Sequence, residues 1–313
     1  MSRRALGRQI NVVGILPVPF QSQHRMTDHT VTLAAGATTH FPSVGHTEPA
    51  LLKILRAVVV SNPTLLDRPL LLGTDHDGFL GNLSVATENV YLDVPLRAIH
   101  ATQHKLFGYA PTWRAALACL TGEDKSHRKW DDRALAYFES EIGEQPFPCD
   151  AASSAPLDLE AWGGAVFCAN GAQRLIAAMG WIAAHKGEAG ELRKARVTHY
   201  QLNGEAVGLM AEAALRKAEI RYGRVGGTWM LAIHSRSGLS FLARPKAWLV
   251  ENGTLVSATA AQVDDRFGQG TLDSLQILPP ELAVAVADDG WLKRQLDLKH
   301  RRYESRLNSS RSE

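Results

Sequence analysis

The chain has 313 residues, 45% of them hydrophobic and 21% charged, which is the composition of a globular protein with one large domain or two ordinary ones. Lysine plus arginine (34) nearly balances aspartate plus glutamate (32), so the net charge of +2 excludes a global field that would attract nucleic acid non-specifically. No apolar run approaches the roughly 18 residues of a membrane span, and no secretory core is present near the first residue.

The three cysteines, Cys119, Cys149 and Cys168, are an odd number without metal-ligand spacing. This usage fits a reducing compartment better than a disulfide scaffold. We therefore expect a cytoplasmic protein that does not bind a membrane.

The first half of the chain mixes strand-like and helical patterns. Residues 10–18 are rich in β-branched side chains and predict a strand, and the polar residues 21–46 predict a long loop. Thr47 and Pro49 are typical of a helix start and Pro63 of a helix end, so a helix is predicted over 50–60. Further along, strands are predicted over 70–72 and 90–99, and helices over 113–120 and 134–142.

The second half predicts alternating strands and helices followed by a β-meander. An apolar run at 165–169 precedes a long helix, 195–202 predicts a strand and 205–221 an amphipathic helix. Asn252-Gly253 is a strong hairpin signal. The meander strands are predicted over 228–234, 239–243, 247–250 and 254–258, with a turn over 235–238.

These patterns together predict an α/β (α+β) fold: a mixed sheet with packed helices and a C-terminal antiparallel meander. Residues 145–159 contain three prolines and predict a linker. We therefore expect an N-terminal α/β region over 1–150, a second α/β region with the meander over 151–290, and a basic tail over 291–313.

The most informative segment runs from Ala165 to Leu175 and breaks at Asn170-Gly171. A strand that ends in Asn-Gly and leads into a helix presents backbone N–H groups and the positive helix end to an anion such as phosphate. Gly171 would allow a phosphate to approach the backbone closely. Gln173 would donate a hydrogen bond from its amide, and Arg174 would bind two phosphate oxygens with its guanidinium. The structural alternative is a plain turn followed by an exposed arginine.

This segment resembles the Asp-Gly-Gln-Gln-Arg or Asp-Gly-Gln-His-Arg element of the ParB and sulfiredoxin-like superfamily, which includes DndB-like proteins of DNA modification systems. The run from Val94 to Gln103 is similar to the Val-Pro-Leu entry of some ParB-like domains. The resemblance spans about 90–205 and implies nucleotide or phosphate handling, with a nucleotide and Mg²⁺ as the ligand. Asn170 stands where the family has Asp, so any role of that carboxylate is in doubt.

Asp75, His76 and Asp77 follow the predicted strand over 70–72 and could bind a divalent cation. These three side chains alone do not supply enough ligands for a complete metal site. An Asp-rich turn is the structural alternative, and no paired His or Cys spacing supports a metal site elsewhere. The other histidines considered are His24, His29, His40 and His46 in the predicted N-terminal loop, and His100 and His104, which we expect at a strand end.

The C-terminus is locally basic, and Arg301, Arg302 and Arg306 are its candidate nucleic-acid contacts. A solvated, partly frayed tail is the alternative interpretation.

Three functions remain open. The first is a nucleotide- or phosphate-binding ParB/DndB-like protein of DNA metabolism, antiviral defence or mobile-element maintenance. The second is a non-catalytic DNA- or RNA-binding or assembly subunit, and the third is a metal-dependent hydrolase. No serine-hydrolase elbow, P-loop or Rossmann motif is present, so the sequence identifies no catalytic residues and leaves oligomerisation open.

Overall fold

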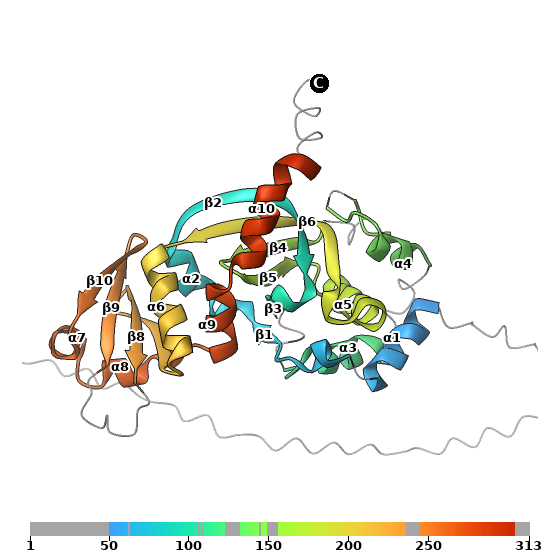
Figure 1. Ribbon diagram of the computed structural model, residues 1–313. Coiled ribbons are helices and arrows are strands. Elements are labelled where there is room, and N and C mark those ends of the chain that lie inside the picture. The colour runs from blue at the N-terminus through green and yellow to red at the C-terminus, as the bar shows by residue number, and fades with distance from the viewer. Residues whose placement is uncertain are drawn as a thin grey trace, which may run out of the picture. The chain divides into compact units, whose positions relative to one another are not determined.

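The computed structural model describes residues 50–61, 63–104, 107, 109–122, 132–143, 145–148, 156–235 and 245–303 (Figure 1). Two units are distinguished, Met1–His46 and Thr47–Glu313, and all described residues belong to the second. The predictions made for 10–18, 21–46, the turn after Ser235, 239–243, Cys149 and Arg306 lie outside the described residues.

A six-stranded mixed sheet forms the centre of the second unit. β3 (Ile99–Thr102) pairs in parallel with both β1 (Leu71–Leu72) and β5 (Ala165–Asn170). β4 (Asp158–Trp162) runs antiparallel to β5 and parallel to β6 (Glu191–Leu202), which pairs in antiparallel register with β2 (Ser84–Pro95). The resulting strand order is β1-β3-β5-β4-β6-β2.

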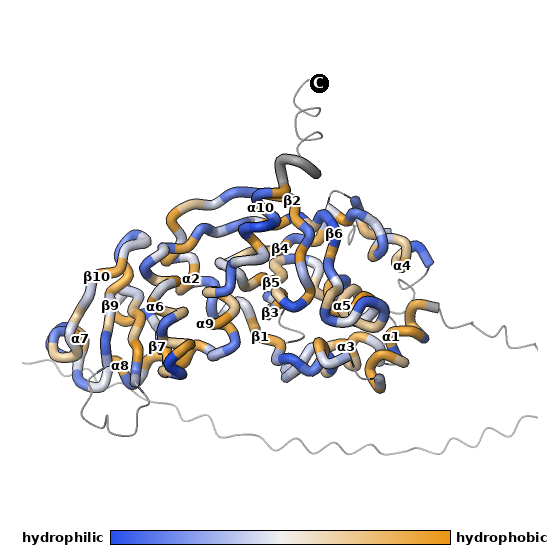
Figure 2. The backbone as a smooth tube through the Cα atoms, viewed as in Figure 1, coloured by the Kyte–Doolittle hydropathy of each residue, from blue (hydrophilic) through white to orange (hydrophobic). Residues whose placement is uncertain are grey.

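Three helices pack together on one face of this sheet: α1 (Ala50–Val60), α3 (Trp113–Thr121) and α5 (Ala172–Lys186). Figure 2 shows the mainly apolar sequence of α1. A Cβ on Gly180 of α5 would come within 2.8 Å of Leu117 in α3, so the missing side chain lets these helices approach closely. The helix α4 (Asp132–Glu139) adds Ala134, Tyr137 and Phe138 to the same core.

A second, fully antiparallel sheet has the order β10-β9-β8-β7-β11. Its hairpin at Asn252-Gly253 has positive φ at both residues, 51° and 78°, as the sequence predicts for this turn. The strands are β7 (Glu219–Val225), β8 (Thr228–His234), β9 (Lys246–Glu251), β10 (Thr254–Ala258) and β11 (Gln276–Ile277).

Apolar residues between the two sheets form a second core, which includes Phe79, Phe167, Tyr222 and Leu231. Residues from α6 (Gly204–Leu215) and α9 (Pro280–Ala287) complete it. The remaining helices are α2 (Asp77–Asn82), α7 (Ala260–Phe267), α8 (Thr271–Ser274) and α10 (Gly290–Arg302). The predicted fold class, α/β with a mixed sheet and an antiparallel sheet, is confirmed.

The structure corrects the predicted boundary near residue 150. β3 lies before it and β5 after it, yet the two strands are hydrogen-bonded neighbours, and β2 pairs with β6 across the same point. Residues 158 and 159, expected at the end of a linker over 145–159, are the first two residues of β4 inside the sheet. One sheet therefore contains both predicted regions.

Two further predictions are wrong in detail. The predicted helix over 205–221 ends at Leu215, and β7 begins at Glu219, because Lys217 adopts a positive φ of 52° that a helix cannot continue through. The predicted strand over 90–99 is divided by the short 3-10 helix η3 (Leu96–Ala98) into β2 and β3.

The C-terminal region is helical as far as Arg302, and the start of this helix is packed against the main core. Trp291 and Leu292 of α10 are buried in the main core, and the Trp291 indole Nε1 donates to the carbonyl of Gly164 at 2.8 Å. Figure 1 shows α10 crossing the sheet near β2. The interpretation of 291–313 as a frayed tail is therefore wrong for residues up to 302.

Candidate functional site

The predicted Asn-Gly turn lies where β5 ends and α5 begins. Gly171 is the residue before the first helical position and has a φ of +87°, which favours glycine. A Cβ at this position would come within 2.9 Å of both Arg174 Nη2 and Leu157 Cδ1. The turn therefore requires glycine for two reasons, backbone conformation and lack of space.

Arg174, in the first turn of α5, is buried with only 7% of its surface exposed. Its Nη2 donates to the carbonyl oxygen of Pro156 at 3.5 Å, and its guanidinium carbon lies 5.4 Å from the centre of the Phe147 ring. Nη1 is buried and has no hydrogen-bond partner among the described residues. The structural alternative of an exposed helix arginine is therefore wrong.

The surroundings of Arg174 are poorly solvated. Burial raises the pKa of the Cys168 thiol to about 12, although the nearby Arg174 charge acts in the opposite direction. Burial also raises the pKa of Tyr137, while the charge of Arg174, whose guanidinium lies within hydrogen-bonding reach of the Tyr137 side chain, acts in the opposite direction. A guanidinium in such a place interacts strongly with any anion that reaches it, because the local dielectric is low.

The other two motif side chains are more accessible. Asn170 is exposed, and its Nδ2 donates to the Pro156 carbonyl oxygen at 3.2 Å, while Gln173 is half-buried. One acceptor oxygen, on Pro156, is thus shared by Asn170 and Arg174. The structure brings together at one helix start all four residues predicted for phosphate binding.

A polar cluster that the sequence did not predict joins the residue after β3 to side chains of α2 and β4. The Gln103 amide follows β3, and its Nε2 donates to Asp77 Oδ2 at 2.7 Å and to Glu160 Oε2 at 3.0 Å. Because one nitrogen bridges both carboxylates, Asp77 and Glu160 lie side by side. Nothing local in the sequence signals this cluster, since its members come from three separate elements.

The pKa of the Glu160 carboxylate is shifted by its surroundings. Burial raises its pKa, while hydrogen bonds from Tyr200 and Gln103 oppose the rise. Burial and the neighbouring Glu160 charge raise the pKa of Tyr200 in turn. The Tyr200 ring stacks on Trp162, with ring centres 3.8 Å apart and planes within 6°. These contacts fix the orientation of the carboxylate.

The motif and the cluster lie near the same edge of the sheet but on opposite faces. Leu159 of β4 packs in the main core with α5, whereas Glu160, the next residue, lies on the face of Trp162, which belongs to the second core. β3 and β5 are parallel, so the residues that follow them, Gln103 and Gly171, emerge at the same edge of the sheet. Asp158, the first residue of β4, pairs with Asn170, and Glu160 lies two residues further along β4, about 7 Å away. Ligands of open α/β sheets bind outside this carboxyl edge.

The predicted metal triplet has other contacts. Buried His76 hydrogen-bonds through Nδ1 to the Tyr222 hydroxyl at 2.7 Å, and Asp77 accepts from Gln103. Asp75 ends the short 3-10 helix η2 (Gly73–Asp75). Among the described residues, no three His, Cys, Asp or Glu side chains gather as a metal site. The prediction of a metal centre at Asp75, His76 and Asp77 gains no support.

The predicted nucleic-acid contacts lie elsewhere. Arg301 and Arg302 are the last two residues of α10, which Figure 2 shows as mainly hydrophilic. No helix in the part of the chain that the structure describes is long and apolar enough to cross a membrane.

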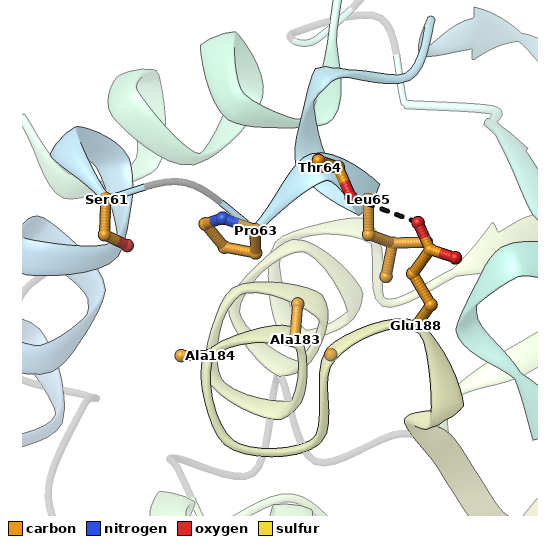
Figure 3. A pocket seen from close by; sticks show the side chains of 8 residues that line it. Ser61, Pro63, Thr64, Leu65, Ala183, Ala184 and Glu188 are labelled. Atoms are coloured by element: carbon orange, nitrogen blue, oxygen red, sulfur yellow. Dashed lines mark hydrogen bonds between the residues drawn. The ribbon is translucent and has the colours of Figure 1, made fainter.

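A cavity of about 440 Å³ lies beside the opposite end of α5 (Figure 3). Pro63 and Ala183 face it, and Thr64 Oγ1 donates to Glu188 Oε1 at 3.0 Å on its rim. It contains none of the residues predicted for phosphate or metal binding. We therefore place the candidate site at the carboxyl edge of β3 and β5.

No protein-family model, curated protein or solved structure matches this chain.

Proposed function

We propose that this chain binds a phosphate-bearing ligand, a nucleotide, at the start of α5, and that it acts as a cytoplasmic ParB/DndB-like protein in DNA metabolism, defence or mobile-element maintenance. The local likeness of Asn170-Gly171-Ala172-Gln173-Arg174 to the superfamily element supports the second part of the proposal. The geometry at the helix start supports the first.

The observation that carries the proposal is the Arg174 guanidinium. It is buried beside the positive end of a 15-residue helix, and its Nη1 has no protein hydrogen-bond partner within the described residues. Leaving a buried charged donor unsatisfied is costly, so a partner is expected in the functional state. A phosphate oxygen supplies that partner and also accepts from the N–H groups of the helix start.

The Pro156 carbonyl indicates where such an oxygen would lie. It accepts from Asn170 Nδ2 and Arg174 Nη2, two donors that a phosphate would use in addition to Arg174 Nη1. An incoming phosphate would compete with this carbonyl for both donors. The stronger, charge-assisted bonds of a phosphate favour the exchange.

The test is calorimetric titration with ATP, GTP, CTP, UTP and inorganic phosphate, each with and without Mg²⁺. The decisive variant is Gln173→Glu. A carboxylate in the first turn stabilises a helix but repels a bound anion, so binding should weaken without a loss of folding stability. We expect affinity for the best nucleotide to fall about tenfold or more while the melting temperature is kept.

The matched control is Gln262→Glu, which also adds a carboxylate to a first helical turn, that of α7, where Gln262 completes a capping box with Thr259. It should leave nucleotide affinity unchanged. Equal effects of the two variants, or no binding of any nucleotide or phosphate by the wild-type chain, would overturn the proposal. Binding of short DNA or RNA alone, unaffected by Gln173→Glu, would instead favour a nucleic-acid-binding subunit.

A further inference from the structure

A second cavity, of about 280 Å³, lies at the opposite edge of the same strands. Ala98 and Gly164, the residues directly before β3 and β5, line it. Because these strands are parallel, this amino edge is separated from the carboxyl edge that bears Gln103 and Gly171. The cavity is thus distinct from the proposed phosphate site.

One wall of this cavity is basic. Arg68 and Arg97 both line it, together with Glu188, whose negative charge favours the charged form of Arg68. Arg68 Nη2 lies 3.1 and 3.2 Å from the two ring nitrogens of buried His100, and it donates to the Ile99 carbonyl at 3.4 Å. Burial and the Arg68 charge lower the pKa of His100 to about 3, so the ring is neutral at physiological pH and can accept from Arg68. Arg68 is thereby held in one orientation.

The facing wall is acidic. Glu281 in α9 and Asp288 directly after it line the cavity, and both are exposed. In the described part of the chain, neither carboxylate forms an ion pair with Arg68 or Arg97. Arg97 on one side, and Glu281 and Asp288 on the other, therefore remain available to a ligand, together with Arg68, whose charge Glu188 partly offsets.

The floor between these walls is apolar. Leu65 and Trp291 line it, and the hydrogen bond from the Trp291 indole to Gly164 fixes the ring. A volume near 280 Å³ falls just below the range of pockets for drug-sized molecules, so it suits a metabolite smaller than a nucleotide.

We propose that this cavity binds a small zwitterion, a free α-amino acid, with the carboxylate on Arg68 and Arg97, the ammonium on Glu281 and Asp288, and the side chain on Leu65 and Trp291. Guanidinium forks match carboxylate geometry, and a carboxylate pair matches an ammonium. Only a ligand with both charges uses both walls.

The test is titration of the full-length protein with each of the standard amino acids. The tightest ligand is then compared with its analogue lacking the amino group and its analogue lacking the carboxyl group. We expect each analogue to bind about tenfold or more weakly, because each leaves one wall unpaired. Absence of binding by every amino acid, or equal binding by either analogue, would overturn the proposal.

Two variants test which side chains bind the carboxylate of the ligand and which bind its ammonium group. Arg97→Gln should abolish the advantage of the amino acid over the analogue without a carboxyl group. Glu281→Gln combined with Asp288→Asn should abolish its advantage over the analogue without an amino group. A merely structural role of these exposed residues would lower affinity for all ligands alike and would contradict the assignment.

The control variant is Arg224→Gln, which removes an exposed arginine in β7 that is remote from the cavity lining and should change no affinity. Gln173→Glu should also leave amino-acid affinity unchanged, since this inference does not rest on the phosphate site.

Discussion

The Tyr303 hydroxyl donates a hydrogen bond to Asp93 Oδ1 at 2.7 Å, and thereby joins the residue after α10 to the edge strand β2. The same carboxylate oxygen accepts from the backbone N–H of Lys194 in β6 at 2.9 Å. Asp93 is 2% exposed, so these donors replace the water that its charge has lost.

We predict that Tyr303→Phe lowers the free energy of unfolding by about 1 to 2 kcal/mol, since it leaves a buried carboxylate with one donor fewer. Urea unfolding followed by circular dichroism measures the change. Tyr109→Phe is the control, because Tyr109 is 96% exposed, and should have no effect. Equal stability of the two variants would contradict the role given to Tyr303.

Arg114→Lys should destabilise the protein by about 2 kcal/mol, because a lysine cannot reproduce the guanidinium fork. Arg114 donates to both oxygens of Asp67, at 2.6 and 3.1 Å, and to four backbone carbonyl groups at or just after the end of α1. Arg224→Lys, which alters an arginine with one backbone contact, is the matched control. Urea unfolding measures the change, and an unfolding midpoint for Arg114→Lys no lower than that of the control would refute the prediction.

His100 should make the fold sensitive to mild acid. Its folded pKa of about 3 lies below the ordinary value of 6.5, so between these limits the unfolded chain binds a proton that the folded chain does not. Stability therefore falls as the pH drops below 6.5, by up to about 1.4 kcal/mol per pH unit from this residue.

The measurement is unfolding free energy between neutral pH and about pH 5, above most carboxylate titrations. His100→Gln should give a shallower decline than the wild type, whereas His185→Gln, at the exposed end of α5, should follow the wild type. Identical slopes for His100→Gln and the wild type would show that His100 does not cause the decline.

Gly171→Ala should cost about 1 to 3 kcal/mol through backbone strain and crowding. Gly227→Ala separates the two effects, because Gly227 has the same φ of +87° but nothing within 4 Å of an added Cβ. We expect the Gly171 variant to be less stable than the Gly227 variant and to bind nucleotide more weakly. Equal losses in the two variants would mean that the space near Arg174 is not limiting.

Local features were predictable from the sequence, and those that depend on distant pairing were not. The apolar run and Asn170-Gly171 specify a strand, a turn and a helix within a few residues, and β5 and α5 follow this pattern. The helix end at Leu215 was missed because the turn at Lys217 contains no glycine or proline to signal it.

The same distinction between local features and distant pairing applies to the candidate site. Its α5 side is contiguous and was predicted, although the burial of Arg174 was not, because Pro156 and Phe147 reach it from a separate segment. The bridge from Gln103 to Asp77 and Glu160 exists only once β3 and β4 are in register with β5. Sequence spacing carries no information on that register.

The position of β2 has a consequence for how the chain folds. This 12-residue strand lies at the sheet edge, and its partner is β6, so that Val90 pairs with Val197. During synthesis β2 leaves the ribosome well before β6 exists, with its hydrogen-bonding edge unpaired. Pairing between segments so far apart slows folding. The central sheet is therefore completed late, and the nascent chain is most prone to aggregate in the interval between synthesis of these two strands.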